Sequence, residues 1–301
     1  LIAAHIRPDG DAIGSLLGLG NALRQAGKTV LMVLSDGIPP NFHYLPGAKL
    51  VKKSIPLDEQ FDITISLDTS DLDRTGGIFG DREIGLNIDH HITNTYYGIS
   101  NYNDPEAVAT CAILASKLQD WGLEINQETA ALLLTGIITD SIGFRTSNMT
   151  SEAMRITADL MDKGANLPEI YQQALVTKSF EQVVYWGHAL KQLHKVKNLA
   201  WTTFLLEDRK EAGYNGNDDA DLNSILSSIQ EISVSILFVE QSNGSVKVSW
   251  RAKPGINIST LAQELGGGGH PAAAGVEMKG MLVDIQNIVI EKTLNLLDGL
   301  N

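Results

Sequence analysis

The chain has 301 residues, of which 43% are hydrophobic and 20% charged, a composition typical of a folded globular protein with two domains. Its net charge of −13 argues against a basic nucleic-acid-binding domain, unless bound cations reverse the charge locally. No apolar run reaches 18 residues, so we expect no membrane span. The one cysteine, Cys111, excludes an internal disulfide framework and is typical of a reducing compartment, so we expect a cytoplasmic protein.

The first part of the chain alternates apolar runs with amphipathic segments. The apolar runs predict buried strands at residues 1–5, 29–35, 62–68 and 83–89. Helical spacing of apolar residues predicts helices between the first two strands and at about 105–121, 127–139, 150–163 and 167–174. This alternation predicts an α/β domain with a mostly parallel sheet covered by helices on both faces.

The second part of the chain follows a predicted helix at 178–193. Apolar or alternating runs at 194–208 and 233–253 predict strands around short turns, and segments 221–232 and 281–300 have a helical pattern. We therefore expect a smaller α/β domain with a mixed sheet and helices on one side. The predicted domains are an N-terminal domain at 1–177, a helical linker at 178–193 and a C-terminal domain at 194–301.

Histidines and acidic residues gather at the ends of the predicted strands. The stretch "HIRPDGDA" places His5, Asp9 and Asp11 within seven positions, a pattern that by itself is also typical of an acidic surface turn. Asp68 and Asp89, however, each end a further apolar run. Because ligands bind beyond the carboxyl ends of parallel strands, we expect these side chains to meet at one edge of the sheet.

Further residues of the same kinds follow in "NIDHHIT" and "GIITDS", which supply His90, His91 and Asp140. Carboxylates with imidazoles and without a thiolate are ligands that suit Mn²⁺. At least six such groups are enough for two ions that share one carboxylate, and two ions ~3.5–4 Å apart can stabilise both oxygens of a phosphoryl displacement. An EF-hand is excluded by Ile13 and Gly20, and a dinucleotide-binding glycine motif by Leu23.

The stretches "HIRPDGDAIGS", "LDTSD", "NIDHHIT" and "TDS" resemble, in order and spacing, the four motifs of the DHH phosphoesterase superfamily. The tail "WRAKPGINISTLAQELGGGGHPAAAG" is similar to its C-terminal DHHA1 domain, so the resemblance covers nearly the whole chain. The two-domain length is most similar to the bifunctional nanoRNase (oligoribonuclease)/pAp phosphatases. This resemblance implies hydrolysis of very short oligoribonucleotides to mononucleotides, and removal of the 3′-phosphate of adenosine 3′,5′-bisphosphate (pAp).

The resemblance also implies roles for the residues at the sheet edge. One Mn²⁺ would bind His5, Asp9 and Asp68, and the second would bind Asp11, Asp68, His90 and Asp140, with Mg²⁺ or Co²⁺ as substitutes. The pair of ions would activate a hydroxide that attacks phosphorus. Asp89 would orient an adjacent ligand or, as the alternative, approach a metal itself, and His91 would face the substrate phosphate. We expect His91, Asp89 and Arg251 to take part in catalysis.

The tail is expected to bind the end of the substrate. The stretch "GGGGH" can be a flexible loop, but the resemblance assigns its residues to a phosphate or nucleotide, together with nearby basic side chains. Arg145 is a further candidate, with a surface salt bridge as the alternative. The predicted substrate-binding residues are Gly267, Gly268, Gly269, His270, Arg145 and Lys253.

The expected partners are short single-stranded RNA or small nucleotides such as pAp and pApA. We expect no association with a membrane. The sequence leaves the oligomeric state open, a homodimer included. The main alternative is a cyclic-dinucleotide or pApA phosphodiesterase, because its chemistry would be the same. A RecJ-type exonuclease, a family II pyrophosphatase and a nucleotide-binding module without catalysis agree less well with the motifs.

Overall fold

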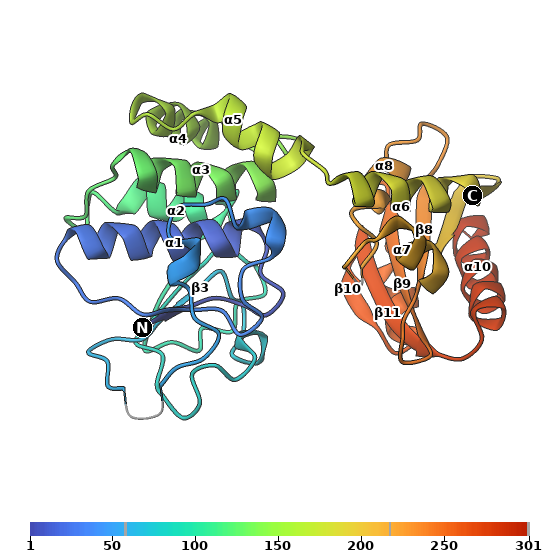
Figure 1. Cartoon of the computed structure of the whole chain (residues 1–301), viewed down its shortest axis with the longest axis horizontal. Coiled ribbons are helices and arrows are strands. Elements are labelled where there is room, and N and C mark those ends of the chain that lie inside the picture. The colour runs from blue at the N-terminus through green and yellow to red at the C-terminus, as the bar shows by residue number, and fades with distance from the viewer. Residues whose placement is uncertain (57–58, 217, 300–301) are drawn as a thin grey trace. The chain divides into compact units, whose positions relative to one another are not determined.

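The computed structural model describes residues 1–56, 59–216 and 218–299 (Figure 1). These residues form two compact units, which divide between Thr177 and Lys178. We call them the N-terminal unit and the C-terminal unit. Among the described residues no helix combines the length and the apolar character that crossing a membrane requires.

The sheet of the N-terminal unit has five parallel strands in the order β2-β1-β3-β4-β5. They are β1 Ile2–Ala3, β2 Met32–Val33, β3 Ile65–Leu67, β4 Leu86–Asp89 and β5 Ser100–Asn103. The first four strands lie within the four predicted apolar runs. The edge strand β5 is not among the predictions, because its sequence Ser-Asn-Tyr-Asn is polar and gives no apolar pattern.

Helices cover one face of this sheet and carry most of the core. Figure 1 shows α1, α2 and α3 on one side of the strands, with α4 and α5 outermost. Leu16 of α1, Ile137 of α3 and Leu67 of β3 are buried in one apolar cluster. The helices are α1 Gly10–Gln25, α2 Thr110–Lys117, α3 Gln127–Asp140, α4 Ser151–Asp162 and α5 Leu167–Tyr171, which continues as a π-helix at Gln172–Val176.

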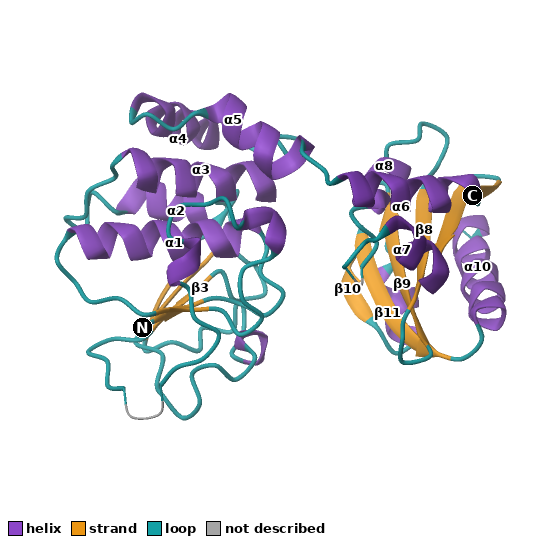
Figure 2. Ribbon diagram, in the orientation of Figure 1, coloured by secondary structure: helices purple, strands orange, loops and turns teal. Residues whose placement is uncertain are grey.

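The opposite face of the sheet packs against the segment that connects β3 to β4 and against its neighbours. Phe79 and Ile84 of this segment form a second apolar cluster with Leu1, Ala3 and Val33. Figure 2 shows mainly loops here. The described part of this unit also contains single turns of 3₁₀-helix at Pro40–Phe42, Ala48–Leu50 and Asp73–Thr75. The predicted α/β class with a parallel sheet is confirmed. In the described part of the unit, however, α-helices pack on one face only, so the expected cover of helices on the other face is not found.

The C-terminal unit contains a six-stranded mixed sheet in the order β10-β11-β9-β8-β7-β6. Among the described strands β7 and β8 pair in parallel and the other pairs are antiparallel, which confirms the predicted mixed sheet. The strands are β6 His194–Val196, β7 Leu199–Phe204, β8 Val234–Glu240, β9 Ser245–Ala252, β10 Gly268–His270 and β11 Ala273–Lys279.

Two apolar clusters lie on the two faces of this mixed sheet. Successive residues of β8 point to opposite clusters: Phe238 belongs to the first cluster and Leu237 to the second. The first cluster includes residues of α9 and α10, and the second includes residues of α6 and α8. Helices therefore cover both faces, and the expectation of helices on one side is wrong. The helices are α6 Phe180–Lys191, α7 Leu206–Ala212, α8 Leu222–Leu226, α9 Ser259–Glu264 and α10 Leu282–Asp298.

The glycine-rich stretch forms the edge strand β10 and the residues that lead into it. β10 pairs antiparallel with β11, with Gly269 opposite Ala274 and Gly268 opposite Gly275. Gly269 has a φ of +142°, and an added Cβ would lie 2.5 Å from the carbonyl oxygen of Ala273. At Gly268 an added Cβ would meet nothing within 4 Å. Close backbone packing therefore explains why position 269 is a glycine, whereas at position 268 there is room for a side chain.

Candidate metal centre

A first group of donor side chains lies where β1 and β3 end. His5 follows β1 and Asp68 follows β3, while Asp9 is the residue that caps the amino end of α1. The Nε2 atom of His5 lies 3.5 Å from Asp68 Oδ2 and 3.7 Å from Asp9 Oδ2. These donor atoms lie within 4.8 Å of one another, and we call His5, Asp9 and Asp68 the first donor group.

The start of α1 explains why Asp9 and Asp11 point to different places. One oxygen of Asp9 accepts hydrogen bonds from the main-chain N–H groups of Asp11 and Ala12, both at 3.1 Å, which is typical of a helix N-cap. Asp11 lies in the first turn of the helix and is buried. Its carboxylate accepts hydrogen bonds from the main-chain N–H groups of Thr110, at 2.6 Å, and Cys111, at 2.9 Å.

A second donor group consists of Asp11, His90 and Asp140. His90 follows β4, and Asp140 is the last residue of α3. The Nε2 atom of His90 lies 3.9 Å from Asp11 Oδ2 and 3.8 Å from Asp140 Oδ2. It also lies 3.6 Å from Asp68 Oδ1. The two oxygens of Asp68 therefore face different histidines, and this carboxylate joins the two groups.

Hydrogen bonds to main-chain carbonyls set the orientation of both imidazoles. His5 Nδ1 lies 2.8 Å from the carbonyl oxygen of Ile6, and His90 Nδ1 lies 3.2 Å from that of Ala107. Because a carbonyl oxygen only accepts, each Nδ1 donates its hydrogen. The Nε2 atom of each ring is then the one that faces the carboxylates. This arrangement is typical of histidines that bind metals through Nε2.

The donor distances fit a metal ion better than they fit hydrogen bonds. Separations of 3.5–3.9 Å between Nε2 and the carboxylate oxygens are too long for hydrogen bonds. Atoms that bind one ion at ~2.1 Å lie ~3–4 Å apart from one another. Oxygen and imidazole donors without a thiolate suit a divalent ion such as Mn²⁺. The residues present therefore fit divalent metal binding.

His91 is held by Asp89 in a separate network. His91 Nδ1 lies 2.7 Å from Asp89 Oδ1, and the Asn94 amide donates to Asp89 Oδ2 at 2.6 Å. Burial alone would raise the pKa of Asp89, but these partners hold it below its usual value. Although His91 Nδ1 also lies 3.8 Å from Asp68, the bond to Asp89 occupies that nitrogen. The Nε2 atom of His91 stays available for another partner.

The clustered charges shift the pKa values of the donors. Burial lowers the pKa of His5, but Asp68 and Asp9 outweigh this effect and raise it to about 10. In the same way, burial is outweighed at His90 by Asp11 and the other carboxylates, and its pKa rises to about 9. Burial raises the pKa of Asp140 to about 6, partly offset by His90. Protons thus partly balance the carboxylates when no cation is bound.

These shifts predict that the metal-free protein loses stability as the pH rises. The folded-state pKa values of His5 and His90 exceed the unfolded value of 6.5. Their stabilisation is therefore fully present below pH 6.5 and is lost as the pH rises through about 9 and about 10. In urea titrations of chelator-treated protein, we expect the free energy of unfolding to fall by on the order of 2 kcal/mol between about pH 7 and 9.5.

Two comparisons isolate this effect from other groups that titrate at high pH. A His90→Asn variant should lose a large part of the fall, because one of the two imidazoles is gone. Saturating Mn²⁺ should suppress it in the unchanged protein, because metal binding releases these protons. A metal-free stability that stays level or increases over this pH range would contradict the prediction.

Arg251, which is predicted to take part in catalysis, and His270, which is predicted to bind substrate, lie on nearby strands of the mixed sheet. Ala273 of β11 pairs with His270 of β10 on one side and with Arg251 of β9 on the other. Residues in register project from the same face of a sheet, so the two basic side chains flank the small Ala273. Both are exposed.

Two other predicted substrate residues have partners of their own. The Lys253 ammonium donates to the carbonyl oxygens of Ile229, at 3.3 Å, and Gln230, at 2.6 Å. This gives Lys253 a role in the fold that needs no substrate. Arg145 is exposed and its Nε donates to the carbonyl oxygen of Ile142 at 3.0 Å. Neither residue makes a salt bridge within the described part of the chain.

Thr110 and Asn94 also belong to the site, although no sequence motif predicts them. Thr110 donates its hydroxyl to Asp68 Oδ1 at 3.0 Å, and Asn94 supports Asp89 as described above. Both side chains are buried. Their contacts join segments far apart in the chain or across a turn, so motif spacing gives no signal for them.

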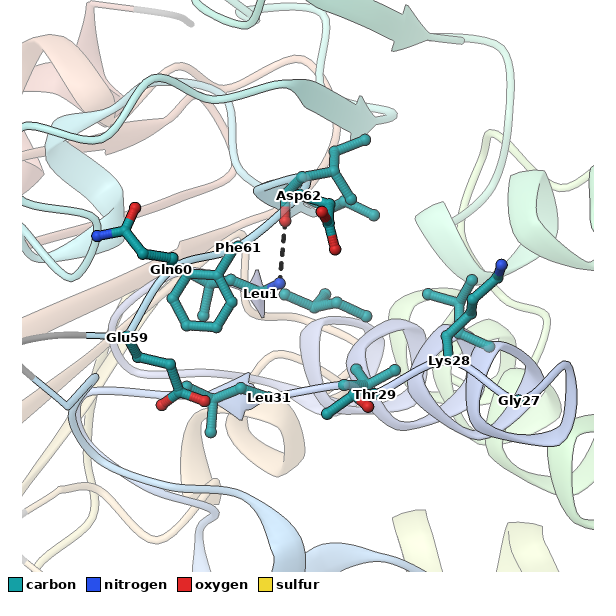
Figure 3. Close-up of a pocket in the computed structure, with 14 residues that line it drawn as sticks. Leu1, Gly27, Lys28, Thr29, Leu31, Glu59, Gln60, Phe61 and Asp62 are labelled. Carbon is teal, nitrogen blue, oxygen red and sulfur yellow. Dashed lines mark hydrogen bonds between the residues drawn. The ribbon is translucent and has the colours of Figure 1, made fainter.

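A pocket of about 640 Å³ lies elsewhere in the N-terminal unit (Figure 3). It is lined by Lys28, Thr29, Phe61 and their neighbours, and by Leu1 at the amino end of β1. None of the donor residues lines it. Since ligands of parallel α/β sheets bind beyond the carboxyl ends of the strands, the donor groups are the better candidate for the functional site.

Two family models match the chain. The N-terminal domain of the DHH family matches residues 1–137, and the DHHA1 domain matches residues 200–297. The bifunctional oligoribonuclease and PAP phosphatase NrnA of Thermus thermophilus is 33% identical over 288 residues, which cover 94% of this chain and 85% of that protein. The protein with the same name from Bacillus subtilis is 26% identical and covers 97% of this chain and 95% of its own length.

A solved structure agrees with these matches. The crystal structure of an exopolyphosphatase-related protein from Bacteroides fragilis has a TM-score of 0.89 and 26% identity, and the match covers 99% of this chain and 93% of that chain. The predicted resemblance is confirmed by both family models and by a relative of more than 30% identity over almost the whole chain. The chain therefore belongs to the DHH phosphoesterase family and carries both a DHH domain and a DHHA1 domain.

Proposed function

We propose that this phosphoesterase hydrolyses very short oligoribonucleotides to mononucleotides and removes the 3′-phosphate of pAp, with two Mn²⁺ ions at the donor groups. The observation that carries the proposal is the pair of groups joined by Asp68, whose oxygens face His5 and His90 at 3.5 and 3.6 Å. Relatives named as bifunctional oligoribonucleases and PAP phosphatases, which match almost the whole chain, support the same activity.

The residues of the N-terminal unit divide between the two ions. The first ion would bind the first donor group, and the second would bind Asp11, His90 and Asp140 together with the shared Asp68. When bound, such a pair of ions supplies an activated water molecule and neutralises charge on the phosphate. Mg²⁺ or Co²⁺ would serve as substitutes, because the same oxygen and nitrogen donors accept them.

His91 would bind the substrate phosphate. Asp89 accepts the hydrogen of His91 Nδ1 and leaves Nε2 free to donate. Burial lowers the pKa of His91, but the hydrogen bond to Asp89 and nearby negative charge raise it above its usual value. The imidazole therefore stays protonated over more of the neutral range and can donate to a negatively charged oxygen.

The C-terminal unit would bind the end of the substrate. Arg251 can offer two parallel N–H groups to a phosphate, and His270 lies in register with it across Ala273. Gly268 leaves open space beside this pair for the approach of a ligand to the backbone. Arg145 of the N-terminal unit is a further candidate. A surface that binds one phosphate or nucleotide favours very short chains, because it recognises an end and does not follow a long strand.

Two neighbouring glycines test the part played by β10. Gly268→Ala should leave the free energy of unfolding within about 0.5 kcal/mol, since its Cβ meets nothing, and should raise KM for pAp about tenfold by obstructing the ligand. Gly269→Ala should instead destabilise the C-terminal unit, because its Cβ would collide with Ala273 at a positive φ. Chemical denaturation and steady-state kinetics separate the two effects. An unchanged KM in a stable Gly268→Ala protein would contradict this assignment.

One experiment tests the proposed function as a whole. The purified chain with Mn²⁺ should be offered pAp, pApA, short RNA of two to five nucleotides, and cyclic di-AMP in parallel, and the substrates ranked by kcat/KM. We expect short RNA and pAp to be hydrolysed with much larger kcat/KM than cyclic di-AMP. A large preference for cyclic di-AMP would replace this proposal by a cyclic-dinucleotide phosphodiesterase, and nucleotide binding without hydrolysis would indicate a regulatory module.

A further inference from the structure

Thr110 contacts the carboxylates of both donor groups. It is the first residue of α2 and is fully buried. Its hydroxyl donates to Asp68 Oδ1 at 3.0 Å, and its main-chain N–H donates to Asp11 Oδ2 at 2.6 Å. A single residue thus orients the carboxylate that joins the two groups and a second carboxylate beside it.

Asp68 needs such a partner because its own side chain does not fix the plane of the carboxylate. The terminal torsion of an aspartate is broad, so the two oxygens can rotate at little cost. Here each oxygen has a different task, since Oδ1 faces His90 and Oδ2 faces His5. The hydrogen bond from Thr110 to Oδ1 selects one orientation of the plane.

The hydrogen bonds from Thr110 also stabilise carboxylates that repel one another. Oxygens of Asp11, Asp68 and Asp140 lie 3.9, 3.6 and 3.8 Å from the same atom, His90 Nε2, so these negative charges are close together. Cationic side chains in the place of Thr110 would balance the charge of these carboxylates, but they would compete with metal ions. The hydroxyl and N–H of Thr110 are neutral donors, and they hold the oxygens in place while leaving the net negative charge of the cluster for a cation.

We propose that Thr110 is a positioning residue, which orients Asp68 and Asp11 for the binding of divalent ions. The inference rests on the proposed metal-dependent function and extends it to a residue outside the donor set. Hydrogen-bond partners of metal ligands typically change metal affinity or activity by ~10–100-fold when they are removed.

The test compares three variants by calorimetric titration of the metal-free full chain with Mn²⁺. Thr110→Val has nearly the same shape, keeps the main-chain N–H and loses the hydroxyl. We expect its Mn²⁺ affinity to fall by ~10–100-fold. Thr110→Ser keeps the hydroxyl and should bind Mn²⁺ within about threefold of the unchanged protein. Thr157→Val is the matched control, because Thr157 is also buried and its hydroxyl donates to the main-chain oxygen of Ala153 at 2.9 Å.

The outcomes separate this inference from the proposed function. Reduced affinity in Thr110→Val, with Thr110→Ser and Thr157→Val near the unchanged protein, supports the positioning role. Equal affinity in folded Thr110→Val and in the unchanged protein overturns it and leaves the metal-dependent function standing. A Thr110→Val protein that only unfolds more easily, at unchanged affinity, shows a merely structural role and also overturns it. Failure of the unchanged protein to bind Mn²⁺ overturns both proposals.

Discussion

Asp68→Asn should reduce Mn²⁺-dependent hydrolysis of pAp and short RNA by on the order of 10³-fold or more in kcat/KM. The oxygens of Asp68 lie 3.5 Å from His5 Nε2 and 3.6 Å from His90 Nε2, so a neutral amide weakens both donor groups at once. Asparagine keeps the shape, can accept the hydrogen bond from Thr110, and tolerates the left-handed φ of 52° at this position. We therefore expect the variant to fold, and steady-state kinetics with Mn²⁺ titrations to show the loss.

A second acidic residue of the same unit is the control for this substitution. Asp120 pairs with Lys117 at 3.6 Å and its side chain is 69% exposed. Asp120→Asn should leave both activity and stability nearly unchanged, because exposed ion pairs contribute little. If Asp68→Asn retained activity within tenfold of the unchanged protein, the shared carboxylate would not be part of the catalytic site.

Gly136→Ala should destabilise the N-terminal unit by about 3 kcal/mol and weaken Mn²⁺ binding. Gly136 lies in α3, and an added Cβ would be 2.2 Å from Cys111 Sγ and 2.7 Å from Asp11 Oδ1. Real Cβ atoms do not approach this closely, so the helices would have to separate and Asp11 would have to move. Chemical denaturation of the metal-free chain and calorimetric titration with Mn²⁺ measure the two effects.

Gly187 provides a matched comparison, since it is also a glycine inside a helix, here α6. An added Cβ at Gly187 would meet nothing within 4 Å. Gly187→Ala should therefore stabilise the protein by up to ~1 kcal/mol, which is the usual gain in helix propensity. Equal effects of the two substitutions would show that the close contact at Gly136 does not constrain the metal centre.

The part of the site that depends on strand ends could be predicted from the sequence. His5 and Asp68 each follow an apolar run, and parallel strands bring their carboxyl ends to one edge of the sheet. The positions of Asp9 and Asp11 could also be predicted, because the two residues lie where a turn leads into a helix with a clear apolar pattern. The edge strand β5 could not be predicted, because its polar sequence has no period.

Residues whose roles depend on tertiary packing could not be found in this way. Thr110 stands in an apolar helical run, and only the fold brings its hydroxyl to Asp68. Conversely, the charge of Lys253 suggests a phosphate ligand, whereas its ammonium contacts the main-chain oxygens after α8. The run of glycines indicates a loop by composition, but close approach to β11 makes it an edge strand. Hydrogen bonds and backbone packing decided these positions, and neither leaves a periodic pattern.

The donors of the metal centre are spread along the chain from His5 to Asp140. During synthesis on a ribosome, the first donor group is complete once Asp68 has emerged, whereas the second donor group also needs His90 and Asp140 at the end of α3. If the residues bind ions as proposed, the second ion would have to wait until the chain up to Asp140 has been translated and has folded, because its set of ligands does not exist earlier. Occupation of the second position would then be a late step in the maturation of the unit.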